Sequence, residues 1–290
     1  MKTEGGMTMN RRIERGVVKI GGARGNTFGS LLEEIGQRMG RGERWVLVHG
    51  ASSMMEDLSR AAGTEPLYVT SPSGFRSRFV SKRELEIFKA ACCLFSVQLV
   101  NALGKMGIMA VPLYPSVSKG AIAKRKDALR SVEDGKVRIL RGNYSGSIVS
   151  FDADEIHAIW DLGGLPLLPP LAEDGAMDGE VLNVDGDRLA AAAAAAVKAD
   201  NLTILSNVPG LLRDPGDPAS KITEGNLDGW DDLENFARGN MKRKLLAARE
   251  ALEGGVETVV IADSRAPFPV ESGLSGGGTL LCRGSMATAG

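Results

Sequence analysis

The amino-acid sequence predicts an α/β fold, a three-layer αβα sandwich with a mainly parallel central sheet. Short apolar runs typical of buried strands alternate along the chain with longer segments of helical apolar spacing. Alternating strands and helices form parallel sheets that are covered on both faces and that bind ligands beyond the carboxyl ends of their strands. With 290 residues, the chain is long enough for one large domain or for two fused lobes.

The first part of the chain contains two strand–loop–helix units. The segment Val17–Ile20 predicts a strand, the glycine-rich segment Gly21–Gly25 predicts a turn, and the apolar spacing from Leu31 to Met39 predicts an amphipathic helix. The run Trp45–Val48 predicts a second strand, and a helix follows at Met54–Ala62.

The middle of the chain begins with a long core helix. Apolar residues recur at helical spacing from Arg83 to Met106, and Met109–Tyr114 then indicates a strand. The stretch Lys119–Gly146 breaks the pattern with many charges and turn residues. It therefore predicts a surface hairpin that projects from the sheet.

The last part of the chain resumes the alternation. Alanine is the best helix former, so the run Ala190–Ala196 indicates a packed helix and not a linker. We expect a flexible extension at residues 1–15 and a folded domain at 16–284, with lobes of about 16–180 and 181–284. The remaining expected elements are helices at Asp154–Leu162, Asp187–Ala199 and Met241–Glu253 and strands at Leu165–Leu168, Leu202–Leu205, Thr258–Ala262 and Thr279–Cys282.

The composition argues against several classes of protein. The 35 basic and 36 acidic side chains give a formal net charge of -1, which provides no global attraction to nucleic acid or to an anionic membrane. No apolar run comes near the roughly 20 residues of a membrane span, and the polar start does not suit a signal peptide. Cys92, Cys93 and Cys282 suit buried thiols in a reducing compartment. We expect a cytoplasmic protein that binds neither nucleic acid nor membrane.

Two glycine turns follow predicted strands. Lys19 stands beside Gly21-Gly22, whose backbone N–H groups can bind phosphate, although an ordinary turn with a solvated lysine is equally open. The P-loop and dinucleotide patterns are absent. The segment His49–Ser52 offers a second backbone pocket for an anion. Since His49 and His157 are the only histidines, we expect no histidine-based metal site and a core or loop role for His49.

Two further polar segments lie at predicted helix starts. The short side chains of Asn183–Asp187 suit helix capping as well as substrate binding, and both interpretations stay open. The segment Gly239–Lys244 places three cations where they oppose the helix macrodipole, and an anionic ligand is the simplest explanation. Lysines at separate strand–helix junctions, an aspartate loop and two glycine turns together suit phosphoryl transfer, which depends on positioning and charge stabilisation.

These motifs resemble the amino acid kinase superfamily over Val17–Cys282. In family order they are Val17-Val18-Lys19-Ile20-Gly21-Gly22, His49-Gly50, Gly74-Phe75-Arg76, Asn183-Val184 with Asp187, Leu205–Leu212, and Gly239 with Met241 and Lys244. The resemblance implies a kinase that uses ATP with Mg²⁺, binding the substrate in the N-terminal lobe and ATP in the C-terminal lobe. The magnesium would arrive with the nucleotide, because no carboxylate cluster forms a dedicated metal site.

The resemblance also implies roles for individual residues. Lys19 and Lys244 would stabilise the transition state, and Asp187 would orient their ammonium groups. The residues implied to hold the substrate are Gly50, Ala51, Ser52, Arg76 and Asn183. The residues implied to bind ATP are Gly21, Gly22, Asn207, Gly210, Leu211 and Lys244.

Within the acetylglutamate kinase branch, the chain is most similar to kinases that act on 2-aminoadipate or glutamate attached to a small acidic carrier protein, LysW. Ala51 and Ser52 depart from the longer glycine run of acetylglutamate kinases. Lys119–Arg141 holds eight basic and three acidic side chains, which can steer an acidic carrier or form a solvated hairpin. The resemblance implies a homodimer that makes an acyl phosphate on carrier-bound aminoadipate, in lysine biosynthesis, with carrier-bound glutamate for arginine as a second substrate. Arg78 would contact the carrier or the same substrate.

Three alternatives stay open. A kinase of free N-acetylglutamate in arginine biosynthesis is the runner-up. A carbamate or uridylate kinase fits both lysines but suits Gly74-Phe75-Arg76 less well, and a non-enzymatic nucleotide sensor would be expected to lose Lys19 or Lys244. One methylene separates aminoadipate from glutamate and contributes only about 1–3 kcal/mol to discrimination, so the sequence leaves that choice open.

Overall fold

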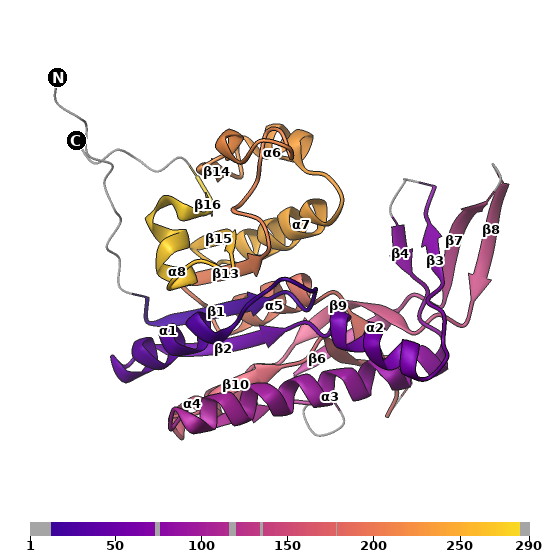
Figure 1. Ribbon diagram of the computed structural model, residues 1–290, viewed down its shortest axis with the longest axis horizontal. Coiled ribbons are helices and arrows are strands. Elements are labelled where there is room, and N and C mark those ends of the chain that lie inside the picture. The colour runs from indigo at the N-terminus through magenta and orange to yellow at the C-terminus, as the bar shows by residue number, and fades with distance from the viewer. Residues whose placement is uncertain (1–12, 73–75, 116–119, 134–135, 178, 285–290) are drawn as a thin grey trace.

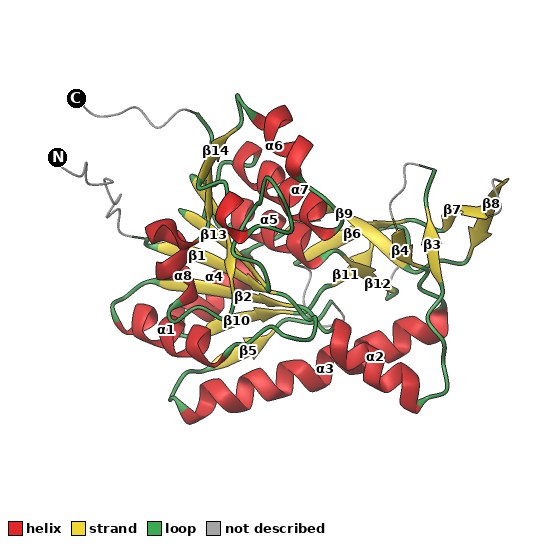
Figure 2. Ribbon diagram, turned by 45° about the horizontal axis from the view of Figure 1, so that its top comes forward, coloured by secondary structure: helices red, strands yellow, loops and turns green. Residues whose placement is uncertain are grey.

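The computed structural model of this protein describes residues 13–72, 76–115, 120–133, 136–177 and 179–284. A mainly parallel sheet lies between layers of helices (Figures 1 and 2), which confirms the predicted α/β class. Residues 1–12 of the expected N-terminal extension lie outside the described ranges, and Arg15 already belongs to the first strand.

The central sheet has the strand order β14-β16-β15-β13-β1-β2-β10-β5. Every neighbouring pair is parallel except β15 with β16. The seven strands expected from the sequence are all present, β5 being shorter than expected, and β14 was not predicted. The strands are β1 (Arg15–Ile20), β2 (Arg44–His49), β5 (Ala110–Pro112), β10 (Leu165–Leu168), β13 (Asn201–Ser206), β14 (Glu224–Asn226), β15 (Thr258–Asp263) and β16 (Thr279–Cys282).

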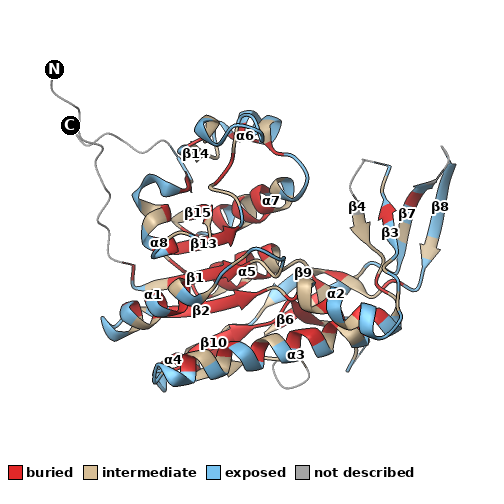
Figure 3. Ribbon diagram, in the orientation of Figure 1, coloured by how far each residue is buried: buried red, intermediate tan, exposed pale blue. Residues whose placement is uncertain are grey.

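Helices cover both faces of this sheet because neighbouring side chains of a strand point in opposite directions. Val17 joins a core with α4, α5 and α7, whereas Val18 joins a core with α1, α3 and α8. The buried residues concentrate in the strands between these layers (Figure 3). The helices are α1 (Gly29–Gly40), α2 (Ser52–Ala61), α3 (Lys82–Lys105), α4 (Asp154–Asp161), α5 (Gly186–Ala196), α6 (Trp230–Phe236), α7 (Asn240–Glu253) and α8 (Pro269–Ser272).

A small closed barrel lies beside the central sheet and was not predicted. It consists of β6 (Ala121–Arg125), β9 (Ser145–Phe151), β11 (Leu171–Asp174) and β12 (Val181–Val184). The hairpin expected within 119–146 is present as β7 (Ala128–Glu133) and β8 (Lys136–Arg141), but the flanks of that stretch form barrel strands. A second hairpin, β3 (Tyr68–Thr70) with β4 (Arg76–Arg78), lies beside it, and both form an arm beyond α2 (Figure 1).

The long helix α3 is apolar enough, by length and composition alone, to cross a membrane, which corrects the expectation that no segment comes near that limit. One side of it nevertheless packs inside the protein: Leu99 and Leu103 are fully buried against α1 and the sheet. Phe88 and Cys92 pack with α2. The helix therefore serves as a core helix of this fold.

Candidate active site

A buried cluster of two lysines and one aspartate joins three elements at the carboxyl edge of the sheet. Lys19 lies near the end of β1, Asp187 in the first turn of α5 and Lys244 early in α7. Lys19 Nζ lies 2.6 Å from Asp187 Oδ1, and Lys244 Nζ lies 3.1 Å from Asp187 Oδ2. All three side chains are at most 10% exposed. The structure thus brings together the three residues that the sequence assigned to catalysis.

The electrostatics of this cluster favour an additional anion. Burial would raise the pKa of Asp187, but the charges and hydrogen bonds of Lys19 and Lys244 outweigh it and hold that pKa well below its usual value of 3.8. Burial lowers the pKa of Lys244, Asp187 opposes that shift, and Lys19 adds to it. Two ammonium groups and one carboxylate leave one uncompensated positive charge in a buried site, where it interacts strongly with a negative ligand.

The start of α5 shows which side chain of Asn183–Asp187 caps the helix. Asp185 is the N-cap residue, and its carboxylate accepts hydrogen bonds from the backbone N–H groups of Asp187 at 2.9 Å and Arg188 at 3.2 Å. Because Asp185 satisfies the helix terminus, the carboxylate of Asp187 is available to the two lysines.

The two glycine turns touch each other through their backbones. A Cβ atom on Gly22 would lie 2.3 Å from the backbone nitrogen of Ala51, and one on Gly50 would lie 2.5 Å from that of Gly22. Ser53 N donates to Gly22 O at 2.8 Å, and Gly50 N donates to Ile20 O at 3.0 Å. Glycine is therefore required at both positions, and the turns form one continuous backbone surface beside Lys19.

A cleft of about 790 Å³ runs along this surface. It is bordered on one side by α2, β4 and β12 and on the other by the loop after β13 and the start of α7. Arg76 lies in β4, but its side chain is outside those described, whereas Arg78 on the same strand lines the cleft. The other predicted site residues all line it, namely Lys19, Gly21, Gly22, Gly50, Ala51, Ser52, Asn183, Asp187, Asn207, Gly210, Leu211 and Lys244.

The loop after β13 is held at the other end of the cleft. Leu211 N donates to Thr279 Oγ1 at 2.8 Å, and Thr279 Oγ1 donates to Ile222 O at 2.6 Å. Gly210 has a φ of +150°, and a Cβ atom there would lie 2.5 Å from Thr279 Oγ1. This close approach and these hydrogen bonds fix the backbone of the loop at the cleft.

The sequence interpretation missed Ser206, the last residue of β13. Its hydroxyl is buried, lines the cleft and has no hydrogen-bond partner among the described residues. A buried polar group without a partner costs free energy, so a ligand that bonds to it would remove that cost. The signal in the sequence was a polar residue at the carboxyl end of an apolar strand.

His49 is a core residue, as the sequence suggested. It is fully buried, its Nε2 lies 2.8 Å from Ser96 Oγ, and its ring packs on Phe95. Burial lowers its pKa to about 4, the Gly50 backbone opposes this shift, and Lys19 adds to it. The imidazole is therefore neutral near pH 7. The described residues contain no group of three or more histidine, cysteine or acidic side chains placed to hold a metal.

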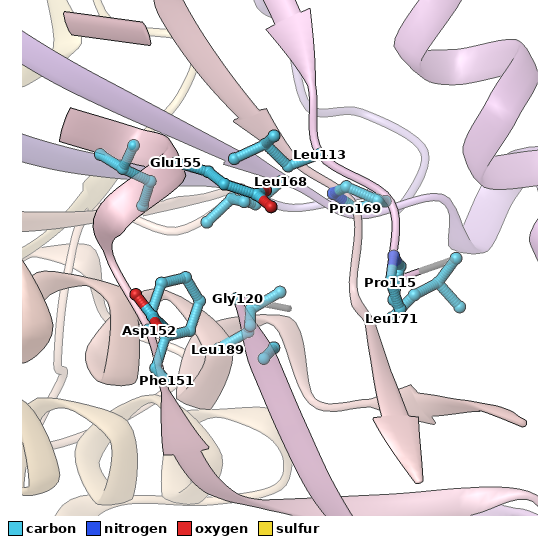
Figure 4. A pocket seen from close by; sticks show the side chains of 12 residues that line it. Leu113, Pro115, Gly120, Phe151, Asp152, Glu155, Leu168, Pro169, Leu171 and Leu189 are labelled. Atoms are coloured by element: carbon cyan, nitrogen blue, oxygen red, sulfur yellow. The ribbon is translucent and has the colours of Figure 1, made fainter. Parts of the chain in front are cut away.

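A second cavity lies away from the lysine cluster, between α4, β10 and the barrel (Figure 4). Apolar side chains such as Phe151 and Leu168 dominate its lining, together with the carboxylates of Asp152 and Glu155. Its volume of about 20 Å³ has room for about one water molecule. It is too small for a substrate.

Known proteins match this chain over most of its length. A relative from Deinococcus radiodurans, named LysW-aminoadipate kinase, is 41% identical over 91% of this chain and 90% of its own length. A Thermus thermophilus protein of the same name is 37% identical over 91% and 99%. One from Sulfurisphaera tokodaii, named LysW-aminoadipate/LysW-glutamate kinase, is 34% identical over 91% and 99%.

Solved structures show the same fold at lower identity. N-acetylglutamate synthase from Neisseria gonorrhoeae superposes with a TM-score of 0.75 at 24% identity, covering 94% of this chain and 60% of that one. Carbamate kinase from Giardia lamblia superposes with a TM-score of 0.66 at 16% identity, covering 96% and 100%. The sequence profile of the amino acid kinase family matches residues 14–263 of this chain. Together with the lysine–aspartate cluster and the two touching glycine turns, this match shows that the chain belongs to the amino acid kinase family.

Proposed function

We propose that this protein transfers the γ-phosphoryl group of ATP to the side-chain carboxylate of 2-aminoadipate bound to a LysW carrier protein, with LysW-bound glutamate as a second substrate. The product is an acyl phosphate for lysine biosynthesis, and for arginine biosynthesis with glutamate. The observation that carries the proposal is the Lys19–Asp187–Lys244 cluster beside two touching glycine turns. The names of relatives at 34–41% identity support the carrier-linked acceptor over free N-acetylglutamate.

The proposed mechanism relies on charge stabilisation. The ATP phosphates lie along Gly21-Gly22 and Lys244, and the nucleoside lies against the Asn207–Leu212 loop. Lys19 and Lys244 stabilise the charge on the transferring group, and Asp187 holds both ammonium groups in place. The acceptor carboxylate is already ionised near pH 7, so the reaction needs no general base. Magnesium arrives with the nucleotide. The reaction takes place in the cytoplasm.

The acceptor occupies the other side of the cleft. Gly50, Ala51 and Ser52 present backbone groups at the start of α2, and Asn183 lines the cleft from β12. Arg76 and Arg78 bring positive charge from β4. Both acceptors keep a free α-carboxylate, because only the amino group is attached to the carrier, and an arginine suits such a group.

The carrier is proposed to dock on the outer face of the β7–β8 hairpin. Val132 lies opposite Val137, and Arg130 lies opposite Ile139, so these side chains share one face with Ala128 and Arg141. This hairpin face consists of Ala128, Arg130, Val132, Val137, Ile139 and Arg141. Val137 and Ile139 are 57% and 59% exposed. Basic and apolar groups side by side complement an acidic protein surface.

Charge reversal on the hairpin face tests this docking. The double change Arg130→Glu and Arg141→Glu is expected to raise KM for the LysW-linked acceptor about tenfold or more at low salt, because it replaces attraction by repulsion. KM for ATP should stay the same, and the difference should shrink as salt is added. Lys105→Glu, at the far end of α3, is the matched control. An unchanged acceptor KM in the double variant would exclude this face as the docking site.

We also propose that the protein is a homodimer that pairs through α3. Cys93, Leu94 and Val97 form an exposed stripe on this helix, and Leu94 and Val97 are 47% and 50% exposed. A stretch of α3 without charged side chains, Ala90–Gly104, contains the whole stripe. Exposed apolar faces of this kind mark protein contacts.

The mass in solution tests the α3 contact. Sedimentation should give a dimer for the wild type, and Leu94→Glu should shift it to monomer at micromolar concentration because it buries a charge in an apolar contact. Lys105→Glu again serves as the control for a charge change on the same helix. A monomeric wild type, or a dimer that Leu94→Glu does not weaken, would contradict the proposal.

A further inference from the structure

Two helices, α2 and α3, hold the guanidinium of Arg78 in the cleft. Its Nε donates to Glu84 Oε1 at 2.8 Å, and its Nη2 donates to Ser59 Oγ at 3.1 Å. Glu84 lies on α3 and Ser59 on α2, and both residues are buried, at 3% and 2% exposed. Among the described residues no group bonds to Nη1. The guanidinium is thus fixed on two sides and keeps donors for a ligand on the third.

Glu84 also takes part in the N-terminal cap of α3. Its Oε2 accepts from the backbone N–H of Ser81 at 3.2 Å, while Ser81 Oγ accepts from the backbone N–H of Glu84 at 3.2 Å. This reciprocal pair is a capping box. One carboxylate therefore serves two partners: Oε1 holds Arg78, and Oε2 holds the helix start.

The fixed position of Arg78 matters for ligand binding because an arginine side chain has many rotamers. An unsupported arginine loses that freedom when it binds a ligand, whereas one that is already held loses little more. The ion pair with Glu84 also neutralises the partly buried guanidinium without occupying Nη1. The arrangement prepares Arg78 for a planar anion such as a carboxylate.

We propose that Glu84, with Ser59, is a positioning residue that fixes Arg78 for the α-carboxylate of the acceptor, the carboxylate that is not phosphorylated. This inference rests on the proposed function in one respect, that the acceptor is an amino acid whose α-carboxylate is free. It holds equally for carrier-linked aminoadipate, carrier-linked glutamate and N-acetylglutamate, which share that group.

Glu84→Gln separates the two tasks of this side chain. Glutamine satisfies a capping box as glutamate does, but it removes the charge that holds Arg78. We expect KM for the acceptor to rise about tenfold, with kcat changed less than about threefold and KM for ATP unchanged. Ser59→Ala, which removes the second contact and leaves the cap intact, should raise the same KM about threefold.

Ser81→Ala is the matched control, because it weakens the cap and leaves the bond between Glu84 Oε1 and Arg78 in place. It should lower the melting temperature and leave the acceptor KM unchanged. The assay uses whichever of the three acceptors the wild type phosphorylates, so a failure of the carrier proposal changes the acceptor and not the comparison. The inference is overturned if Glu84→Gln leaves the acceptor KM unchanged, or if Ser81→Ala raises it as much.

Discussion

Replacing Lys244 with methionine is expected to lower kcat by about 10²–10³-fold, the effect of removing one charge-stabilising donor from a transition state. Lys244 is buried and bound to Asp187, so methionine fills a similar space without the charge. Steady-state ADP release at saturating ATP and acceptor measures the change. The melting temperature reports whether the variant is folded.

The control for Lys244→Met is Lys242→Met, two residues earlier on α7. Lys242 is exposed and does not line the cleft, so its replacement should leave kcat within about twofold. If Lys244→Met kept a kcat within threefold of the wild type while folded, Lys244 would not stabilise the transferring group.

Replacing Asp187 with asparagine is expected to destabilise the protein by about 3–5 kcal/mol, because two ammonium groups would stay buried without their counter-charge. Denaturant unfolding measures this loss at pH 7. The double variant Asp187→Asn with Lys244→Met should be more stable than Asp187→Asn alone, since it removes one of the two repelling charges. If the two changes added independently, the coupling through Asp187 would be disproved.

The stability difference between the wild type and Asp187→Asn depends on pH, because the pKa of Asp187 is lowered in the folded protein. In the unfolded chain the carboxyl group has a pKa of 3.8, and in the folded protein the pKa lies well below that. The ion pairs therefore contribute fully above about pH 4, and their contribution is lost as the pH falls below 3.8 toward the folded pKa. The stability gap between the wild type and Asp187→Asn should narrow over that acidic range.

The central sheet was predictable because its strands are short buried runs separated by helices of clear apolar period. Val17–Ile20 is apolar except for Lys19, Trp45–Val48 is fully apolar, and a glycine turn follows each strand. The barrel escaped prediction because its strands pair over long distances in the chain, Glu173 of β11 lying beside Ile122 of β6. A local pattern of four or five residues does not specify such partners.

The candidate site was predictable where a motif fixes the backbone, as at Lys19, Gly22 and Gly50. It was less predictable where side chains from separate elements meet. Arg78 follows Arg76 by two residues on β4, and only the packing of Glu84 and Ser59 shows how Arg78 is held. The free hydroxyl of Ser206 likewise became visible only through burial.

The most direct measurement is ADP release by the purified protein with ATP and magnesium, offered LysW-aminoadipate, LysW-glutamate and N-acetylglutamate in parallel. We expect turnover of the carrier-linked acceptors, aminoadipate first, and little turnover of N-acetylglutamate, because the hairpin face contributes only when a carrier is present. Turnover of free N-acetylglutamate alone would contradict this expectation and would make the protein a kinase of the free acetylated amino acid.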